Sequence, residues 1–511
     1  MDSPGREAPD TPPRATRREW TGLAVIALPC LVYSMDLTVL NLAIPAISAE
    51  LKPSSAQLLW MIDIYGFLVA GLLITMGTLG DRIGRRRLLL AGAAAFGAAS
   101  WVAAFSGSAP MLIAMRALLG VAGATLAPST LSLIRNMFHD PQQRQFAIGV
   151  WIASFSLGGA IGPLVGGLLL EYFHWGSVFL VAVPVMALLL LLGPRLLPEY
   201  RDPQAGVVDL TSVLLSIVAV LAVIYGVKHV AEHGLQAPSA VAIGGGLLVG
   251  GAFLHRQSRL SYPLLDLGLF RQPRFAAAVS AYGLSSLAMF GIYIFVTQFL
   301  QLVLGLSPLM AGLATLPWAI GFLAGSLGTS RLTRRWLQER IIVGGLALAA
   351  VAFGLMLWVD ATPAGLAILV ASTVLMSLAM APVFTVGNEI IITAAPPERA
   401  GAASAISETA AEFSGALGIA VLGSLGIALY RNVLRDALPA GLDASASAQA
   451  LATLGGALAV GESLEGPPGR ALQQAARDAF MHSLRLAAIV GLVTVSLSAA
   501  LAARMLAGAR R

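Results

Sequence analysis

A cationic stretch, Gly77-Thr78-Leu79-Gly80-Asp81-Arg82-Ile83-Gly84-Arg85-Arg86-Arg87, separates two long apolar runs. Arginine-rich loops mark the cytoplasmic side of membrane proteins, because positive charge is retained on that side during insertion. The apolar runs on either side are each long enough to cross a bilayer as a helix. The stretch therefore predicts a cytoplasmic loop between two membrane spans.

The composition agrees with this prediction. Of the 511 residues, 57% are hydrophobic and only 11% are charged, and the mean hydropathy is +0.81. A soluble protein carries roughly a quarter charged residues. The net charge is +6, but the arginines lie in short loops, where membrane orientation explains them better than a nucleic-acid partner does. Cys30 is the only cysteine, which excludes an intrachain disulfide and a thiolate metal cluster.

About 20 apolar residues cross the hydrocarbon layer as a helix, and on this measure the sequence predicts about fourteen spans. Residues 1–20, rich in Pro and charge, predict a disordered tail. Because no convincing cleavage site follows, we expect the first run to be a retained span. The predicted spans are 21–47, 58–79, 88–106, 110–135, 146–170, 175–194, 208–228, 238–255, 275–304, 309–329, 341–359, 364–388, 402–430 and 481–507.

Arginine is concentrated in alternate loops. The loops 48–57, 106–110, 305–308 and 360–363 are nearly free of it. This pattern predicts that both termini are cytoplasmic and that the number of spans is even. The residues that carry the pattern are Arg82, Arg85, Arg86, Arg87, Arg135, Arg144, Arg256, Arg259, Arg271, Arg274, Arg331, Arg334, Arg335, Arg340, Arg504, Arg510 and Arg511.

Two polar segments, 195–206 and 256–274, flank a pair of apolar runs and leave six spans before the pair and six after it. The stretch 431–480, rich in Ala, Gly, Asp and Ser, predicts a large external loop with a short helix near 471–480. We expect an all-α membrane protein with these parts: tail 1–20, N-terminal six-helix bundle 21–194, linker with two inserted helices 195–274, and C-terminal six-helix bundle 275–507.

Asp36 lies inside the first apolar run, in Met35-Asp36-Leu37-Thr38-Val39-Leu40-Asn41. If the helix enters near residue 21, Asp36 lies about 22 Å along its axis. An ionisable group at that depth is costly and is usually kept for function. Lost hydration favours its neutral form, so that a proton and an organic cation can compete for it. Alternatively, a neighbouring donor such as Thr38 or Asn41 holds the carboxylate in a structural role.

Three further charged residues lie within predicted spans. Glu408 and Glu412 are four residues apart, on one helix face and about 6 Å from each other. Two like charges this close favour protonation of one of them. The alternative is that their span begins late and both are partly hydrated. Arg116 is the one cation found deep within a run and needs a carboxylate or carbonyl partner. We expect it to couple protonation to helix movement, unless it forms a static ion pair or reaches the headgroups.

Asp63 lies near the external end of the second span, either as a solvated helix-end residue or as part of a substrate-entry site.

Aromatic rings attract organic cations, although most aromatic residues of a membrane protein contact lipid or the interface. The candidate cavity aromatics are Trp60, Tyr65, Tyr293, Trp318 and Phe322.

Two glycine patterns suggest movement. The stretch 158–167 predicts a broken or thinned fifth span that can bend and slide, because glycine permits close helix contact and proline removes a hydrogen bond. In the cationic loop, Asp81 is expected to close a cytoplasmic gate by charge pairing or helix capping. The candidate residues are Gly158, Gly162, Pro163, Gly166 and Gly167 in the span, and Gly77, Asp81, Arg82, Gly84 and Arg85 in the gate.

These stretches resemble the motifs of the major facilitator superfamily. Residues 77–87 resemble its loop signature, 116–123 its fourth-span motif and 158–167 its antiporter motif. Residues 35–45 and 298–308 are similar to stretches of the fourteen-helix drug:proton antiporters. The resemblance covers roughly residues 20–507.

Within that family, residues 59–65 and 403–412 look closest to the QacA-type and LfrA-type multidrug exporters. The resemblance implies lipophilic cations as substrates, with Asp36 as the first-span carboxylate and Glu408 and Glu412 as the penultimate-span acids. Some relatives have an acid in span ten that is associated with dications. Phe322 stands at the corresponding position here, which favours monovalent substrates.

The sequence therefore predicts a multi-pass protein of the bacterial inner membrane that exports lipophilic cations in exchange for protons. No Gly-x-x-x-x-Gly-Lys-[Ser/Thr] run occurs, so we expect the proton gradient, not ATP hydrolysis, to drive it. We expect a monomer without metal or cofactor. Export of an endogenous metabolite or antibiotic is an alternative; a membrane-embedded enzyme and a non-transporting sensor are less favoured.

Overall fold

The computed structural model describes residues 14–201, 209–260, 263–394, 400–439, 442–464 and 466–508. Among them are 14 helices that are long and apolar enough to cross a membrane, which confirms the predicted all-α membrane fold. Helices suit a lipid environment because every backbone polar group within them is bonded inside the same segment. Residues 1–13, 202–206 and 509–511, for which the sequence predicts a tail, part of a linker and two cytoplasmic arginines, lie outside the described residues.

The N-terminal half contains six of these spans. Its first helix starts four residues earlier than predicted, because Thr16 and Glu19 form a capping box that places residues 17–20 in a helical turn and not in a tail. The fourth span is divided near residues 124–125. The helices are α1 (Arg17–Leu51), α2 (Ser55–Ile83), α3 (Arg85–Ala104), α4 (Ala109–Gly123), α5 (Leu126–Met137), α6 (Pro141–Tyr172), α7 (Ser177–Leu180) and α8 (Ala182–Leu196).

The C-terminal half contains six more spans, and the two inserted helices precede it. The inserted pair is α9 (Leu210–His233) and α10 (Ala237–Gln257). The C-terminal helices are η1 (Leu269–Arg271), α11 (Pro273–Gln298), η2 (Phe299–Val303), α12 (Pro308–Arg335), α13 (Gln338–Leu355), η3 (Met356–Trp358), α14 (Pro363–Ala394), α15 (Ala400–Arg435) and α18 (Pro467–Gly508).

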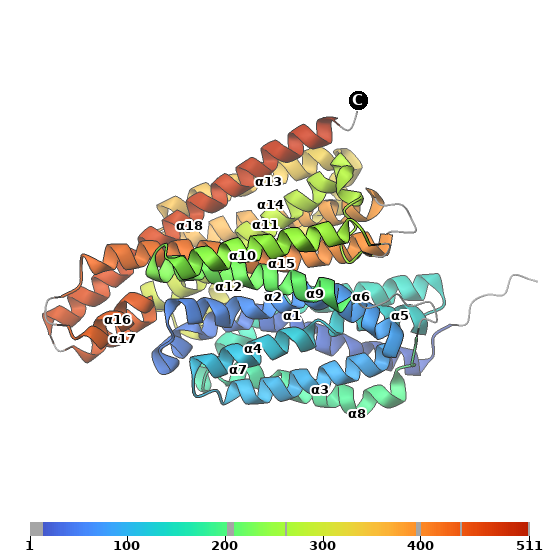
Figure 1. The fold of residues 1–511 in the computed structure, drawn as a ribbon, viewed down its shortest axis with the longest axis horizontal. Helices are drawn as coiled ribbons and strands as arrows, with labels where there is room; N and C mark the ends of the chain where they lie inside the picture. The colour runs from blue at the N-terminus through green and yellow to red at the C-terminus, as the bar shows by residue number, and fades with distance from the viewer. Residues whose placement is uncertain are drawn as a thin grey trace, which may run out of the picture.

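The two halves meet along two main seams. One is formed by α2 and α15, and the other by α6 and α12, while α1 also touches α11. In Figure 1, α13 and α18 diverge from α3 and α8 toward the end of the molecule that carries the C-terminus. The inserted helix α9 lies against both α2 and α15, and so covers the first seam from outside the two bundles.

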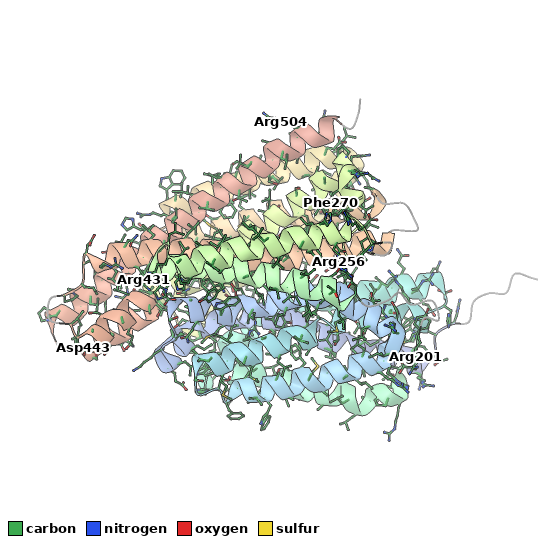
Figure 2. The ribbon with its side chains drawn as sticks, viewed as in Figure 1. Arg201, Arg256, Phe270, Arg431, Asp443 and Arg504 are labelled. Atoms are coloured by element: carbon green, nitrogen blue, oxygen red, sulfur yellow. The ribbon has the colours of Figure 1, made fainter. Side chains whose placement is uncertain are left out.

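Charged residues separate the two ends of the bundle. Figure 2 shows Arg256 and Arg504 toward the end where the chain terminates, whereas Arg431 and Asp443 lie toward the opposite end. We call these the predicted cytoplasmic and predicted external ends. This arrangement places Arg256 and Arg504 at one end, as the loop-charge pattern requires.

The predicted external segment 431–480 differs from expectation. Residues 431–435 complete α15, and the short helix expected near 471–480 is the first part of the long helix α18. The segment between them contains two helices that the sequence did not indicate, α16 (Ala444–Ala452) and α17 (Leu454–Ser463). Ser55 Oγ at the start of α2 donates to the Ala452 carbonyl at 2.6 Å. The α16–α17 segment therefore joins the two halves at the predicted external end.

Candidate functional site

Asp36 is paired with Arg116 inside the N-terminal half. The Arg116 Nη1 atom lies 2.5 Å from Asp36 Oδ2, and the side chains are 1% and 9% exposed. Arg116 Nε also donates to the Met61 carbonyl at 3.0 Å. The alternative donors are occupied within their own helix, since Thr38 donates to the Met35 carbonyl and Asn41 to the Leu37 carbonyl. The partner of Asp36 is therefore an arginine 80 residues away in sequence.

Two tyrosines continue from this ion pair toward the C-terminal half. The Arg116 guanidinium lies 4.6 Å from the centre of the Tyr65 ring, and Tyr65 lies 5.9 Å from the Tyr33 ring. Tyr33 Oη donates to Glu412 Oε1 at 3.2 Å, which crosses from α1 to α15. These five residues, Asp36, Arg116, Tyr65, Tyr33 and Glu412, form what we call the central polar chain. The sequence did not suggest Tyr33, because one tyrosine in an apolar run resembles an ordinary packing residue.

Glu408 lies one turn before Glu412 on α15. Its side chain is exposed, whereas Glu412 is half-buried. Glu408 stands eight residues after the start of α15, about 12 Å along the helix axis. Glu408 is therefore the more exposed acid of the pair, and Glu412 is the acid that contacts Tyr33.

Asp63 has a partner that the sequence did not reveal. Lys228 of the inserted helix α9 extends its ammonium group to 2.7 Å from Asp63 Oδ1. The side chains of Lys228 and Asp63 are 1% and 0% exposed, so Asp63 is not a solvated helix-end residue. The prediction that Arg116 is the one deep cation is wrong, because Lys228 is buried as well. The predicted span ended at Lys228, whereas α9 continues to His233 and so places the lysine inside the helix. The only apolar residues between Lys228 and the end of α9 are Val230 and Ala231, so the sequence carried little sign that this lysine is buried.

The cationic loop contacts the N-terminal half and the start of the linker, where Glu199 pairs with Arg86 and Arg87. Arg85 Nε donates to Asp81 Oδ1 at 2.7 Å, and Arg85 Nη1 donates to the Pro128 carbonyl at 3.2 Å. Gly84 has a φ of +115°, a conformation that favours glycine and separates α2 from α3. Arg82 is exposed, and Gly77 faces Pro128. Asp81 is thus held by charge pairing, one of the two expected roles, but its partner lies in the same loop.

The glycine-rich stretch is a packing surface on an unbroken helix. The fifth span was predicted to be broken or thinned; it is thinned by its glycines but not broken, because α6 runs from Pro141 to Tyr172 with Pro163 inside it. A Cβ atom at Gly158 would lie 2.1 Å from the Leu31 carbonyl oxygen, and one at Gly162 would lie 2.2 Å from Thr38 Oγ1. The glycines therefore permit the close contact between α6 and α1, the helix that carries Asp36. Gly166 faces Val39 of α1, whereas Pro163 and Gly167 face Gly312 and Pro308 of α12.

The five candidate aromatics do not gather in one place. The Trp60 ring lies against the Lys228 ammonium group, and Tyr65 belongs to the central polar chain. Phe322 packs on Phe384. Tyr293 and Trp318 pack at 4.8 Å and line a narrow hollow of about 10 Å³ between α11, α12 and α14. That hollow is apolar and none of the buried acids lines it. The hollow has room for about one water molecule and is too small for an organic cation.

Comparison with known proteins agrees with the fold. The sequence profile of the Major Facilitator Superfamily matches residues 26–419. The chain is 44% identical to the multidrug efflux pump LfrA of Mycolicibacterium smegmatis, over 95% of this chain and 96% of LfrA. It is 37% identical to the methyl viologen resistance protein SmvA of Salmonella typhimurium, over 92% and 95%.

A solved structure shares the fold at low sequence identity. It is the inward-facing, unoccupied form of a bacterial homologue of the human lysosomal transporter Spinster, with a TM-score of 0.69 and 18% identity. The alignment covers 96% of this chain and 98% of that one. The likeness therefore extends over both halves of the molecule.

Proposed function

The chain belongs to the major facilitator superfamily, and from this premise we propose that it is a proton-coupled exporter of lipophilic organic cations. The observation that carries the proposal is the central polar chain, which links a buried carboxylate in one half to a second carboxylate in the other. A transporter that alternates between two open states needs a charge whose neutralisation changes contacts between its halves.

In this mechanism Asp36 is the first proton acceptor. When Asp36 is ionised, it neutralises Arg116 inside the bundle. When Asp36 binds a proton, the charge of Arg116 is left with the Met61 carbonyl and the Tyr65 ring. A buried charge that loses its partner is costly, so the helices around it shift until the charge is compensated again. Tyr33 and Glu412 extend this shift to α15.

The proposed substrates are quaternary ammonium compounds and cationic dyes. Support comes from LfrA, whose name identifies a multidrug efflux pump. Phe322 supplies no charge in span ten, which favours monovalent cations. SmvA, however, is named for resistance to methyl viologen, which is a dication. Transport assays with a monovalent and a divalent probe of similar size decide between these two preferences.

We further propose that the protein acts as a monomer in the bacterial inner membrane, with both termini in the cytoplasm. The alternating loop charge supports this orientation. The energy source in this proposal is the proton gradient, with no metal, cofactor or nucleic acid involved. Export of an endogenous metabolite or antibiotic is the alternative, and it would use the same acids.

Everted membrane vesicles test the proposal. Addition of ethidium or a quaternary ammonium compound is expected to reverse the quenching of a pH-sensitive dye, because entry of the cation releases protons. Asp36→Asn is expected to abolish this response. The double variant D36N/R116Q removes both charges, so we expect it to fold without an unpaired buried charge but still not to move protons. If wild-type vesicles release no protons with any cation of the panel, drug export is excluded.

A further inference from the structure

Lys228 occupies a position in which an organic cation would be well bound. Its Nζ atom lies 2.7 Å from Asp63 Oδ1 and 3.7 Å from the centre of the Trp60 ring. A carboxylate for charge and an aromatic face for the alkylated nitrogen are the two groups that recognise organic ammonium ions. The second carboxylate oxygen, Asp63 Oδ2, is buried and has no hydrogen-bond partner among the described residues.

The environment of this pair is otherwise apolar. Phe67 of α2, Ile224 of α9 and Ala416 of α15 form a small hydrophobic cluster of their own, against which Trp60 and Phe413 pack. Apolar side chains alone would attach α9 to the bundle, and replacing a buried ion pair by apolar groups is often neutral or stabilising. Attachment of α9 therefore does not account for a lysine at this position.

The location also suits a site on the transport route. Asp63 lies eight residues from the start of α2, about 12 Å from the predicted external end. The helix α9 lies against α2 and α15, which form one of the seams between the halves. Movement of the halves would therefore change the distance between Lys228 and the Asp63 carboxylate.

We propose that Asp63 and Trp60 form a second subsite for monovalent organic cations, occupied in this conformation by the Lys228 ammonium, which a substrate cation displaces. The inference rests on the proposed export of lipophilic cations. Because Lys228 is tethered to α9, it competes with the substrate at a fixed local concentration. Loss of the lysine charge is therefore expected to strengthen substrate binding, which is the reverse of what an ordinary binding residue does.

Binding of tetraphenylphosphonium to the purified full-length protein in lipid nanodiscs tests this inference. Lys228→Met keeps the length of the side chain and removes its charge, and we expect its dissociation constant to fall at least tenfold. The double variant D63N/K228M removes the carboxylate as well and is expected to lose that gain. Val218→Leu, an exposed position on the same helix, serves as the control and should bind as the wild type does. An unchanged or weaker affinity of K228M overturns the inference.

A second measurement uses the wild-type protein, in case K228M does not fold with Asp63 unpaired. An apolar carbodiimide activates a carboxyl group, and an amine 2.7 Å away then forms an amide with it while a urea departs. Mass spectrometry is expected to detect an Asp63–Lys228 crosslink whose yield falls when tetraphenylphosphonium saturates the protein. A crosslink yield that does not respond to the bound cation contradicts displacement.

The binding measurement separates this inference from the proposed function. If the wild type and K228M both fail to bind tetraphenylphosphonium, the proposed function fails too. If the wild type binds it and K228M binds it with the same affinity, only the role of Lys228 is overturned.

Discussion

Tyr33 in α1 donates a hydrogen bond to Glu412 in α15, at 3.2 Å, and so connects the two halves beside the buried Asp36–Arg116 pair. A tyrosine hydroxyl can bond the carboxylate without adding charge. The contact joins α1 to α15 without a second buried charge, and we expect its removal to weaken the proposed coupling between the two halves.

Tyr33→Phe should slow cation-driven proton release about tenfold or more, since a hydrogen bond to a charged group contributes about 1.5–3 kcal/mol. The measurement is the initial rate of dye dequenching in everted vesicles. Tyr65→Phe is the matched control, because Tyr65 Oη has no hydrogen-bond partner among the described residues while its ring contacts Arg116. Equal rates for the two variants would remove Tyr33 from the coupling mechanism.

Gly158→Ala should disrupt the contact between α6 and α1. Its Cβ atom would lie 2.1 Å from the Leu31 backbone oxygen, which cannot move aside as a flexible side chain can. Forced overpacking of this kind costs about 1–3 kcal/mol. Gly159→Ala is the control, since its Cβ atom would lie 3.4 Å from Ser34 Oγ. We expect a lower thermal unfolding temperature for G158A alone, and a similar loss in both variants would show that close packing at Gly158 is not the cause.

A disulfide between positions 48 and 455 should lock the predicted external end. A Cβ atom on Gly455 would lie 3.2 Å from Ser48 Cβ, close to the roughly 3.5–4.5 Å found in disulfides. In a C30A background, oxidation of S48C/G455C should therefore stop transport, and reduction should restore it. Each single-cysteine variant provides a control for the substitution itself. Full transport by the crosslinked protein would show that α17 does not separate from α1 during the cycle.

Asp209 should make the docking of α9 depend on pH. Partial burial opposes its ionisation, but hydrogen bonds from Arg256 and Ser212 outweigh this effect and hold the pKa of Asp209 below its usual range. A lowered pKa in the folded state means that the stabilisation is present above the unfolded pKa, about 3.9, and is lost as pH falls through the folded value. Asp209→Asn keeps the helix cap but loses the ion pair.

Because Arg256 is partly exposed, we expect D209N to cost no more than about 1 kcal/mol at neutral pH. Thermal unfolding of wild-type and D209N protein measures this difference as the pH is lowered toward 3. The two curves should converge at the acidic end. A difference that stays constant across the range would mean that the charge of Asp209 is not the stabilising feature.

Several features of the molecule were accessible from sequence because they depend on local composition. Apolar length predicts a span, and loop arginines place Arg256 and Arg504 at one end of the bundle. Asp36 and Arg116 could each be identified as costly within an apolar run, since the expense of a charge in lipid depends on its depth. Helix ends were less accessible, as the capped start of α1 at Arg17 shows.

Only the tertiary structure decided which charges meet. Asp36 and Arg116 are 80 residues apart, Asp63 and Lys228 are 165 apart, and Tyr33 and Glu412 are 379 apart. No local pattern encodes such pairs, because they depend on how the helices pack around one another. Likewise, the glycines of α6 indicated close contact but not that α1 would be the partner. The sequence by itself determined that this protein spans the membrane and contains buried charge, and the packing of its helices determined where that charge is compensated and which contacts join the two halves.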